Sequence, residues 1–119
     1  MFVERALLPH LKRMLSKFPV VSLTGPRQSG KTTLLRNGFP DFTYVNLERP
    51  DQRQLLADDL GGYLKLLGPG VIFDEAQNLP DLFSYVQAVV DESNNPGNYI
   101  LSGSQSFLMN DHIAQSLAG

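Results

Sequence analysis

The sequence contains no cysteine and no tryptophan, and its acidic and basic residues nearly balance. The absence of cysteine excludes disulfides, cysteine-ligated zinc, iron–sulfur clusters and thiol nucleophiles, and it fits the cytoplasmic location that we expect. A count of 10 Lys and Arg against 12 Asp and Glu excludes a strongly basic surface for nucleic acid, although not a local patch. No apolar run approaches the roughly 18–20 residues of a membrane span, so we expect no membrane partner.

What remains is typical of one globular domain, with 119 residues of which 42% are hydrophobic and 18% charged. Hydrophobic spacing predicts helices over residues 3–18, 31–37, 51–67 (interrupted near Gly61-Gly62), 80–92 and 107–117. Short buried strands are predicted over residues 19–24, 42–47, 71–73 and 99–101. Strands that alternate with helices indicate an α/β domain with a mostly parallel sheet.

Residues 25–32, GPRQSGKT, match the phosphate-loop pattern G-x-x-x-x-G-K-[ST] between a predicted strand and a predicted helix. Glycines let the backbone approach a triphosphate, and the start of the helix adds partial positive charge. We expect the Lys31 ammonium to reach the β- and γ-phosphates, and the Thr32 hydroxyl to bind Mg²⁺. The alternative is a glycine-rich turn with a solvated lysine. The candidate nucleotide-binding residues are Gly25, Pro26, Arg27, Gln28, Ser29, Gly30, Lys31, Thr32 and Thr33.

Two carboxylates end the apolar strand VIFDE, about forty residues after the phosphate loop. Because parallel sheets place ligands at the carboxyl ends of their strands, Asp74 is expected beside Thr32, where it would hold Mg²⁺ directly or through water. Glu75 is expected to orient and polarise the water that attacks the γ-phosphate. In the alternative interpretation, both acids cap the next helix.

The second and fourth predicted strands also end in polar residues. If the sheet is parallel, Ser102 or Ser104 can contact the γ-phosphate or the attacking water, and Ser104 is slightly preferred as the catalytic sensor. Asn46 can hold Glu75 aside until a partner binds. The alternative is that these three residues form turns and bond only local backbone.

With these residues in hand, the chain resembles the N-terminal ATPase domain of predicted bacterial and archaeal AAA+ superfamily ATPases, which carry a C-terminal domain of uncertain function. The similar segments are GPRQSGKT at 25–32, YVNLE at 44–48, VIFDEAQ at 71–77 and ILSGSQSF at 100–107, after a leading helix that contains Arg5. The resemblance implies a three-layer α/β/α P-loop NTPase fold with strand order 5-1-4-3-2, and ATP and Mg²⁺ as cofactors.

The same resemblance implies roles for particular residues. Lys31 and Thr32 would bind phosphate and metal, Asp74 would be the metal acid and Glu75 the catalytic acid. It also suggests the switching role of Asn46, and a contact between Arg5 and the adenine.

The resemblance departs at the end of the chain, because members of the family continue into a fifth strand, a basic finger or sensor residue and the C-terminal domain. We therefore expect residues 1–119 to be one truncated domain, with a leading helix over 1–18 and the nucleotide-binding sheet over 19–119. A missing fifth strand would leave the phosphate-loop strand as an apolar edge that favours self-association. An absent finger would leave the isolated chain weakly active or inactive.

The function that these residues predict is ATP binding and Mg²⁺-dependent ATP hydrolysis. One alternative is a nucleotide-gated module that switches a protein or DNA partner, and hydrolysis then only resets it. A small-molecule kinase ranks last, because no acceptor pocket or lid is evident in the sequence.

Overall fold

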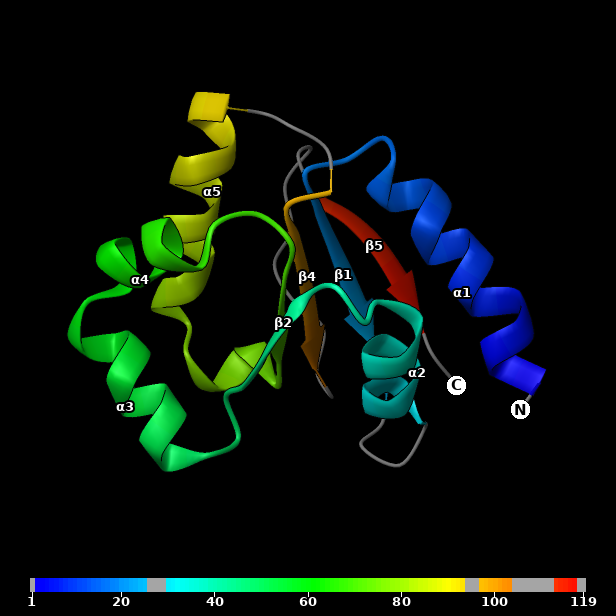
Figure 1. The fold of residues 1–119 in the computed structure, drawn as a ribbon, viewed down its shortest axis with the longest axis horizontal. Helices are drawn as coiled ribbons and strands as arrows, with labels where there is room; N and C mark the ends of the chain where they lie inside the picture. Colours follow the sequence, from blue (N-terminus) through cyan, green and yellow to red (C-terminus); the bar gives the residue numbers. More distant parts are fainter. Residues whose placement is uncertain (1, 26–29, 94–96, 104–112, 118–119) are drawn as a thin grey trace.

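The computed structural model describes residues 2–25, 30–93, 97–103 and 113–117 (Figure 1). The helices are α1 (Phe2–Leu15), α2 (Lys31–Gly38), α3 (Pro50–Asp58), α4 (Leu60–Leu67) and α5 (Asp81–Ser93), with one 3-10 turn, η1 (Ala76–Asn78). The strands are β1 (Val20–Thr24), β2 (Thr43–Asn46), β3 (Val71–Asp74), β4 (Tyr99–Gly103) and β5 (Ile113–Leu117).

The described strands form one parallel sheet in the order β2-β3-β4-β1-β5. Read from the opposite edge, this is the order that the resemblance implied. Parallel neighbours need crossover connections: α2 follows β1, α3 and α4 follow β2, and α5 follows β3. The carboxyl ends of the strands therefore share one edge of the sheet, where Asn46 of β2 lies opposite Asp74 of β3.

Helices cover both faces of the sheet, which makes the three-layer α/β/α architecture that the resemblance implied (Figure 1). Neighbouring residues of β3 show the division: Phe73 packs in the core beneath α3, α4 and α5, and Ile72 packs in the core beneath α1 and α2. Leu82 of α5 and Leu11 of α1 are fully buried in these two cores. Burial of each such side chain contributes about 1.5–3 kcal/mol, so both layers anchor the strands that carry the site.

The expected helix over residues 107–117 is wrong for Ile113–Leu117, which forms β5 and pairs in parallel with β1 along its length. Residues 107–112 lie outside the described part of the chain. The run IAQSL fits either structure, because apolar residues four apart suit a helix and five residues also suit a strand. The edge of β1 favours the strand over the helix, because the backbone N–H and C=O groups along that edge need hydrogen-bond partners. β1 is thus an inner strand, and the expectation of a domain without a fifth strand is corrected.

The boundary between α3 and α4 also differs from the expected one. The interruption lies at Asp59, and Gly61 and Gly62 are inside α4. The Asp59 carboxylate caps α4 by accepting a hydrogen bond from the Gly62 backbone N–H at 3.1 Å. A Cβ on Gly62 would collide with that carboxylate. Glycine here therefore permits a helix cap and does not break the helix.

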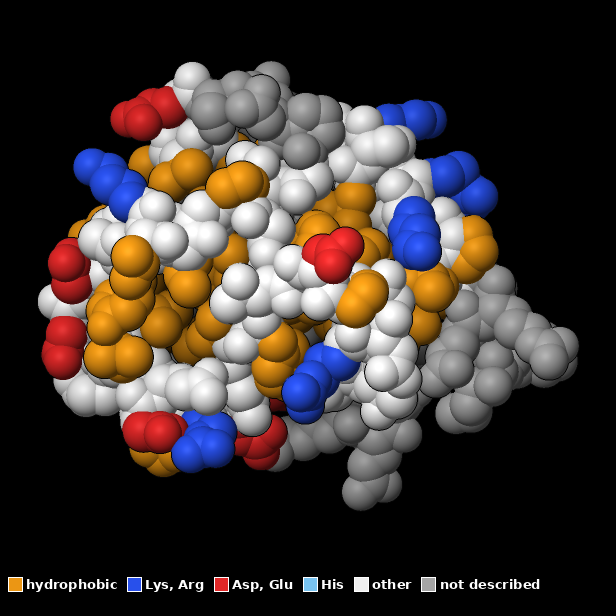
Figure 2. All heavy atoms as spheres, in the orientation of Figure 1, with side chains coloured by type: hydrophobic (Ala, Val, Ile, Leu, Met, Phe, Trp, Pro, Cys, Tyr) orange, Lys and Arg blue, Asp and Glu red, His pale blue; other side chains and the backbone are white. Residues whose placement is uncertain are grey.

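The net charge is only -2, but the charged side chains are unevenly distributed over the surface. Figure 2 shows Lys and Arg side chains gathered on the side of α1, whereas Asp and Glu side chains predominate on the side of α3 and α4. Lys12 and Arg13 lie in the last turn of α1, and Asp51 and Asp58 belong to α3. In the described residues, no helix has the length and apolar character needed to cross a membrane.

Candidate functional site

The phosphate loop ends at Gly30, the residue that precedes α2. Gly30 has φ +84°, in the left-handed region that glycine enters without strain. Among the described residues, no atom lies within 4 Å of a Cβ placed there. The first N–H groups of a helix have no partner within the helix and attract anions. This end of α2 therefore fits a phosphate group.

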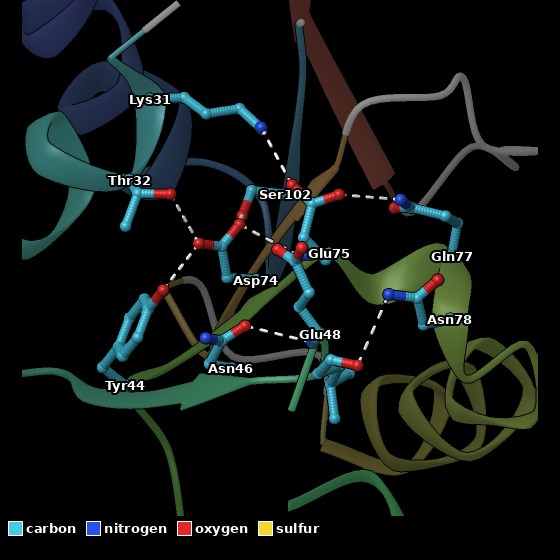
Figure 3. Close-up of polar contacts among 11 residues, drawn as sticks. Lys31, Thr32, Tyr44, Asn46, Glu48, Asp74, Glu75, Gln77, Asn78 and Ser102 are labelled. Carbon is cyan, nitrogen blue, oxygen red and sulfur yellow. Dashed lines mark hydrogen bonds and ion pairs between the residues drawn. The ribbon is translucent and has the colours of Figure 1, made fainter. Parts of the chain in front are cut away.

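Lys31 is the first residue of α2, and it is only 2% exposed. Its Nζ forms an ion pair with Glu75 Oε2 at 3.0 Å (Figure 3). A buried ammonium needs a compensating charge, because burial removes its hydration. Glu75 supplies that charge across 44 residues of sequence. The lysine predicted to bind phosphate thus lies against the carboxylate predicted to orient water.

Glu75 is in the left-handed conformation with φ +54°, and it is the one described non-glycine residue with positive φ. Such a backbone costs energy, and residues held this way are frequent in active sites. Its backbone N–H donates to Asp74 Oδ1 at 2.9 Å, and Gln77 Nε2 donates to Glu75 Oε1 at 2.8 Å. Burial alone would raise the pKa of Glu75. The hydrogen bond from Gln77 and the ion pair with Lys31 outweigh it, so the pKa lies below its usual value.

Asp74 ends β3 and receives hydrogen bonds on both carboxylate oxygens (Figure 3). Oδ2 accepts from the Thr32 hydroxyl at 2.7 Å and from the Tyr44 hydroxyl at 2.6 Å. Oδ1 accepts from the Ser102 hydroxyl at 2.7 Å, in addition to the bond from Glu75. The carboxylate is therefore fixed by groups from α2, β2 and β4.

The donor set fits Mg²⁺. Thr32 and Asp74 bring a hydroxyl and a carboxylate together, and such oxygen ligands are those that Mg²⁺ prefers. Among the described residues, no group of three or more His, Cys, Asp and Glu side chains forms a metal cage.

The structure brings together Lys31, Thr32, Asp74 and Glu75, and it places with them Ser102, one of the two serines expected at this edge. Gly25 bonds through its N–H to the Gly103 carbonyl at 3.1 Å. Thr33 is exposed and lines a small hollow with Leu8 of α1. Five predicted residues lie outside the described part of the chain, as does the side chain of Arg5: Pro26, Arg27, Gln28, Ser29 and Ser104.

Asn46 lies at the predicted edge of the sheet, but its amide oxygen accepts from the Glu48 backbone N–H at 3.0 Å. Its own N–H donates to Gln52 Oε1 at 2.7 Å. These bonds agree with the local turn that was the alternative interpretation. A switching role for Asn46 toward Glu75 stays a prediction.

Two residues of the site were missed from the sequence, Tyr44 and Gln77. Both were inside the segments that carried the resemblance. Tyr44 lies two positions before Asn46, and Gln77 two positions after Glu75. Strand period would have placed Tyr44 on the same face as Asn46. No sequence rule predicted that its hydroxyl reaches Asp74, because that contact depends on the pairing of β2 with β3.

A phosphate loop that joins a strand to a helix, with its lysine and threonine beside the acids of a neighbouring parallel strand, defines the class of P-loop NTPases. The particular family follows from comparison with known families. A model of the AAA domain matches residues 17–119, and the chain belongs to this family. It is thus a nucleotide-binding, ATPase-like domain.

Two mycobacterial proteins are similar to the whole chain. "Uncharacterized protein Rv2008c" of Mycobacterium tuberculosis and "Uncharacterized protein Mb2031c" of Mycobacterium bovis are each 39% identical to it over 123 residues. The chain spans only 27% of the length of each. Among solved structures, PCH-2 of C. elegans is 14% identical, with a TM-score of 0.46 over 96% of this chain and 38% of PCH-2. That likeness is too distant to support an inference about activity.

Proposed function

We propose that this domain binds ATP with Mg²⁺ and hydrolyses it. The observation that carries the proposal is the convergence of Lys31 and Thr32 with Asp74 and Glu75 at one edge of the sheet. A phosphate-binding lysine, a hydroxyl for the metal and two adjacent carboxylates are the groups that phosphoryl transfer to water requires. The AAA family of the chain supports the same reaction.

Each group has a distinct task in the proposed reaction. A bound Mg²⁺ would supply positive charge against the negative charge of the phosphates. Thr32 and Asp74 would hold this cation. Lys31 would leave Glu75 and bind the phosphates, and Glu75, freed from its partner, would orient the attacking water. Ser102 lies close enough to Asp74 to be the polar group at the end of β4 that senses the γ-phosphate, and Ser104 remains the other candidate.

Nucleotide binding is tested best without leaving an unpaired charge in the site. Lys31→Met with Glu75→Gln removes both members of the ion pair together. We expect this double variant to lose affinity for ATP by at least about 100-fold, equivalent to roughly 3 kcal/mol, as a charge-assisted site loses its cation. Titration calorimetry of the full-length protein measures it. Lys65→Met, which changes an exposed lysine of α4, is the matched control. Equal affinity in both variants would reject the site.

Hydrolysis is tested with Glu75→Gln alone. ATP should still bind, and turnover should fall by about 10²–10⁴-fold, the usual contribution of a positioned general base. Phosphate release by the full-length protein measures turnover. Glu92→Gln, at an exposed position near the end of α5, controls for the loss of a carboxylate. Unchanged turnover in Glu75→Gln would reject Glu75 as the water-orienting group while leaving the binding proposal intact.

A further inference from the structure

Tyr44 is tied to the site from two sides. Its hydroxyl donates to Asp74 Oδ2 at 2.6 Å, and this is the oxygen that also accepts from Thr32. Its ring lies under the Arg36 guanidinium, whose carbon is 4.8 Å from the ring centroid. Arg36 belongs to the last turn of α2, the helix that begins with Lys31 and Thr32. Tyr44 of β2 therefore contacts the last turn of α2 through Arg36, and it shares with Thr32, in the first turn, an oxygen of the acid that ends β3.

The hydrogen bonds of Asp74 show what this connection does. A carboxylate has about four lone-pair positions, and here they meet three hydroxyls and one backbone N–H. The hydroxyls of Tyr44 and Thr32 both donate to Oδ2 of Asp74. The phenol therefore helps to fix the position of the oxygen that accepts from Thr32. A phenol hydroxyl is protonated at neutral pH, so Tyr44 is the donor in this hydrogen bond.

We propose that Tyr44 is a positioning residue for the metal site: it holds the Asp74 carboxylate in the orientation that receives Thr32, and Arg36 holds the ring of Tyr44 in place. The inference rests on the proposed function, because it assigns Asp74 and Thr32 to Mg²⁺. Groups that orient the ligands of a metal commonly change metal affinity by 10–100-fold when they are removed. Tyr44 itself need not touch the cation or the nucleotide.

The experiment compares two affinities in the full-length protein. Binding of a fluorescent, non-hydrolysable ATP analogue is measured with EDTA, and then as Mg²⁺ is added. Tyr44→Phe removes the hydroxyl and keeps the ring. We expect the Mg²⁺ concentration for half-maximal enhancement to rise about 10-fold, while the affinity measured in EDTA stays unchanged. A merely structural role would change both affinities or neither.

Two further variants support the comparison. Tyr85→Phe changes a tyrosine on α5 that is 46% exposed, and it should behave as the wild type. Arg36→Gln keeps the phenol but removes the cation over its ring, and it should raise the Mg²⁺ requirement by a smaller factor, about 3-fold. Arg36→Gln also keeps the proposal testable if Tyr44→Phe does not fold.

The outcomes distinguish a failure of the proposed metal site from a failure of the positioning role of Tyr44. If the wild type binds the analogue equally well with and without Mg²⁺, the proposed metal role of this site fails, and the role of Tyr44 fails with it. If the wild type needs Mg²⁺ and Tyr44→Phe needs the same concentration or less, the positioning role alone is overturned. A lower requirement would mean that the phenol competes with the cation.

Discussion

Two ion pairs have nearly equal lengths. One lies at the carboxyl edge of the sheet, and the other lies at the start of α3, a few residues after β2. Lys31 and Glu75 are 3.0 Å apart, and Arg49 and Asp51 are 3.1 Å apart. The side chains of the first pair are 1% and 5% exposed, and those of the second 61% and 65%. Water screens the second pair and leaves it little net energy, whereas loss of one partner of the first strands a charge away from water.

The comparison shows that burial, rather than distance, assigns each pair its role. Arg49 and Asp51 are two residues apart and join the residue before α3 to its first turn. Lys31 and Glu75 come from α2 and from the end of β3, so their contact depends on the whole sheet. The buried pair holds the two side chains to which we assign phosphate binding and water orientation against each other, and in the proposed reaction a nucleotide must separate them.

The largest expected effect comes from removing one member of the buried pair. Lys31→Met should lower the free energy of unfolding of the nucleotide-free protein by about 3 kcal/mol, because it leaves the Glu75 carboxylate without its cation. Urea denaturation measures this change. Adding Glu75→Gln should restore most of the loss, since the remaining pair is then neutral. A loss below about 0.5 kcal/mol in Lys31→Met would show that water reaches the carboxylate and that the contrast between the pairs is wrong.

A smaller effect is expected from acid. The pKa of Glu75 is lowered from its ordinary value of 4.5, so between these two values the unfolded chain binds a proton that the folded chain does not. The stability difference between the wild type and Glu75→Gln, measured with EDTA and without nucleotide, should be constant above about pH 6. It should then shrink as the pH falls below 4.5 toward the folded-state pKa. A difference that grows in acid would contradict the sign of this shift.

Gln77 donates a hydrogen bond to the carboxylate of the buried pair, so its removal tests how much that bond stabilises the ionised Glu75. Gln77→Ala removes the amide that donates to Glu75 Oε1. We expect a loss of about 1–2 kcal/mol in the free energy of unfolding, as for a hydrogen bond to a charged group. Because this bond lowers the folded-state pKa of Glu75 and not the unfolded-state value, the acid-dependent decrease described above should also be smaller and should end at a higher pH. Gln54→Ala on α3 is the control, because its amide donates to the exposed Asp58; it should change stability by no more than about 0.5 kcal/mol.

The smallest effect is expected for the exposed pair. Asp51→Asn should leave the free energy of unfolding close to that of the wild type, and added salt should remove any difference. The Arg49 hydrogen bond, which is the main cause, lowers the pKa of Asp51, yet water surrounds both groups. A loss comparable to that of Lys31→Met would break the distinction between the two pairs.

Local patterns predicted most of the fold. Buried apolar runs marked β1, β2, β3 and β4, and the spacing of leucines marked α1. Two elements needed information that local patterns lack. Ile113–Leu117 became β5 because β1 had an edge to pair, and the boundary at Asp59 arose because its carboxylate reaches the N–H of Gly62. In both places a backbone hydrogen-bonding need outweighed a weak sequence preference.

The site was predictable in its chemistry and much less so in its contacts. The pattern around Lys31 and the acids after β3 named the principal groups, because phosphate and Mg²⁺ demand particular side chains at particular spacings. Ser102 was one of two serines expected at this edge as a contact for the γ-phosphate or the attacking water, but its hydrogen bond to Asp74 was not expected. The hydroxyl of Tyr44 on the same carboxylate was not expected, since it depends on which strand lies beside β3.

By itself, therefore, the sequence predicted the class of chemistry: GPRQSGKT and the paired acids, flanked by a strand and a helix, indicate the phosphate and metal site that we propose. The tertiary structure alone decided that Lys31 lies against Glu75, and that Tyr44 and Ser102 share Asp74. The reason is that side-chain identity is local, whereas hydrogen-bond partners and burial arise from residues far apart in the chain. Only the packing of helices on a paired sheet brings such residues within 3 Å.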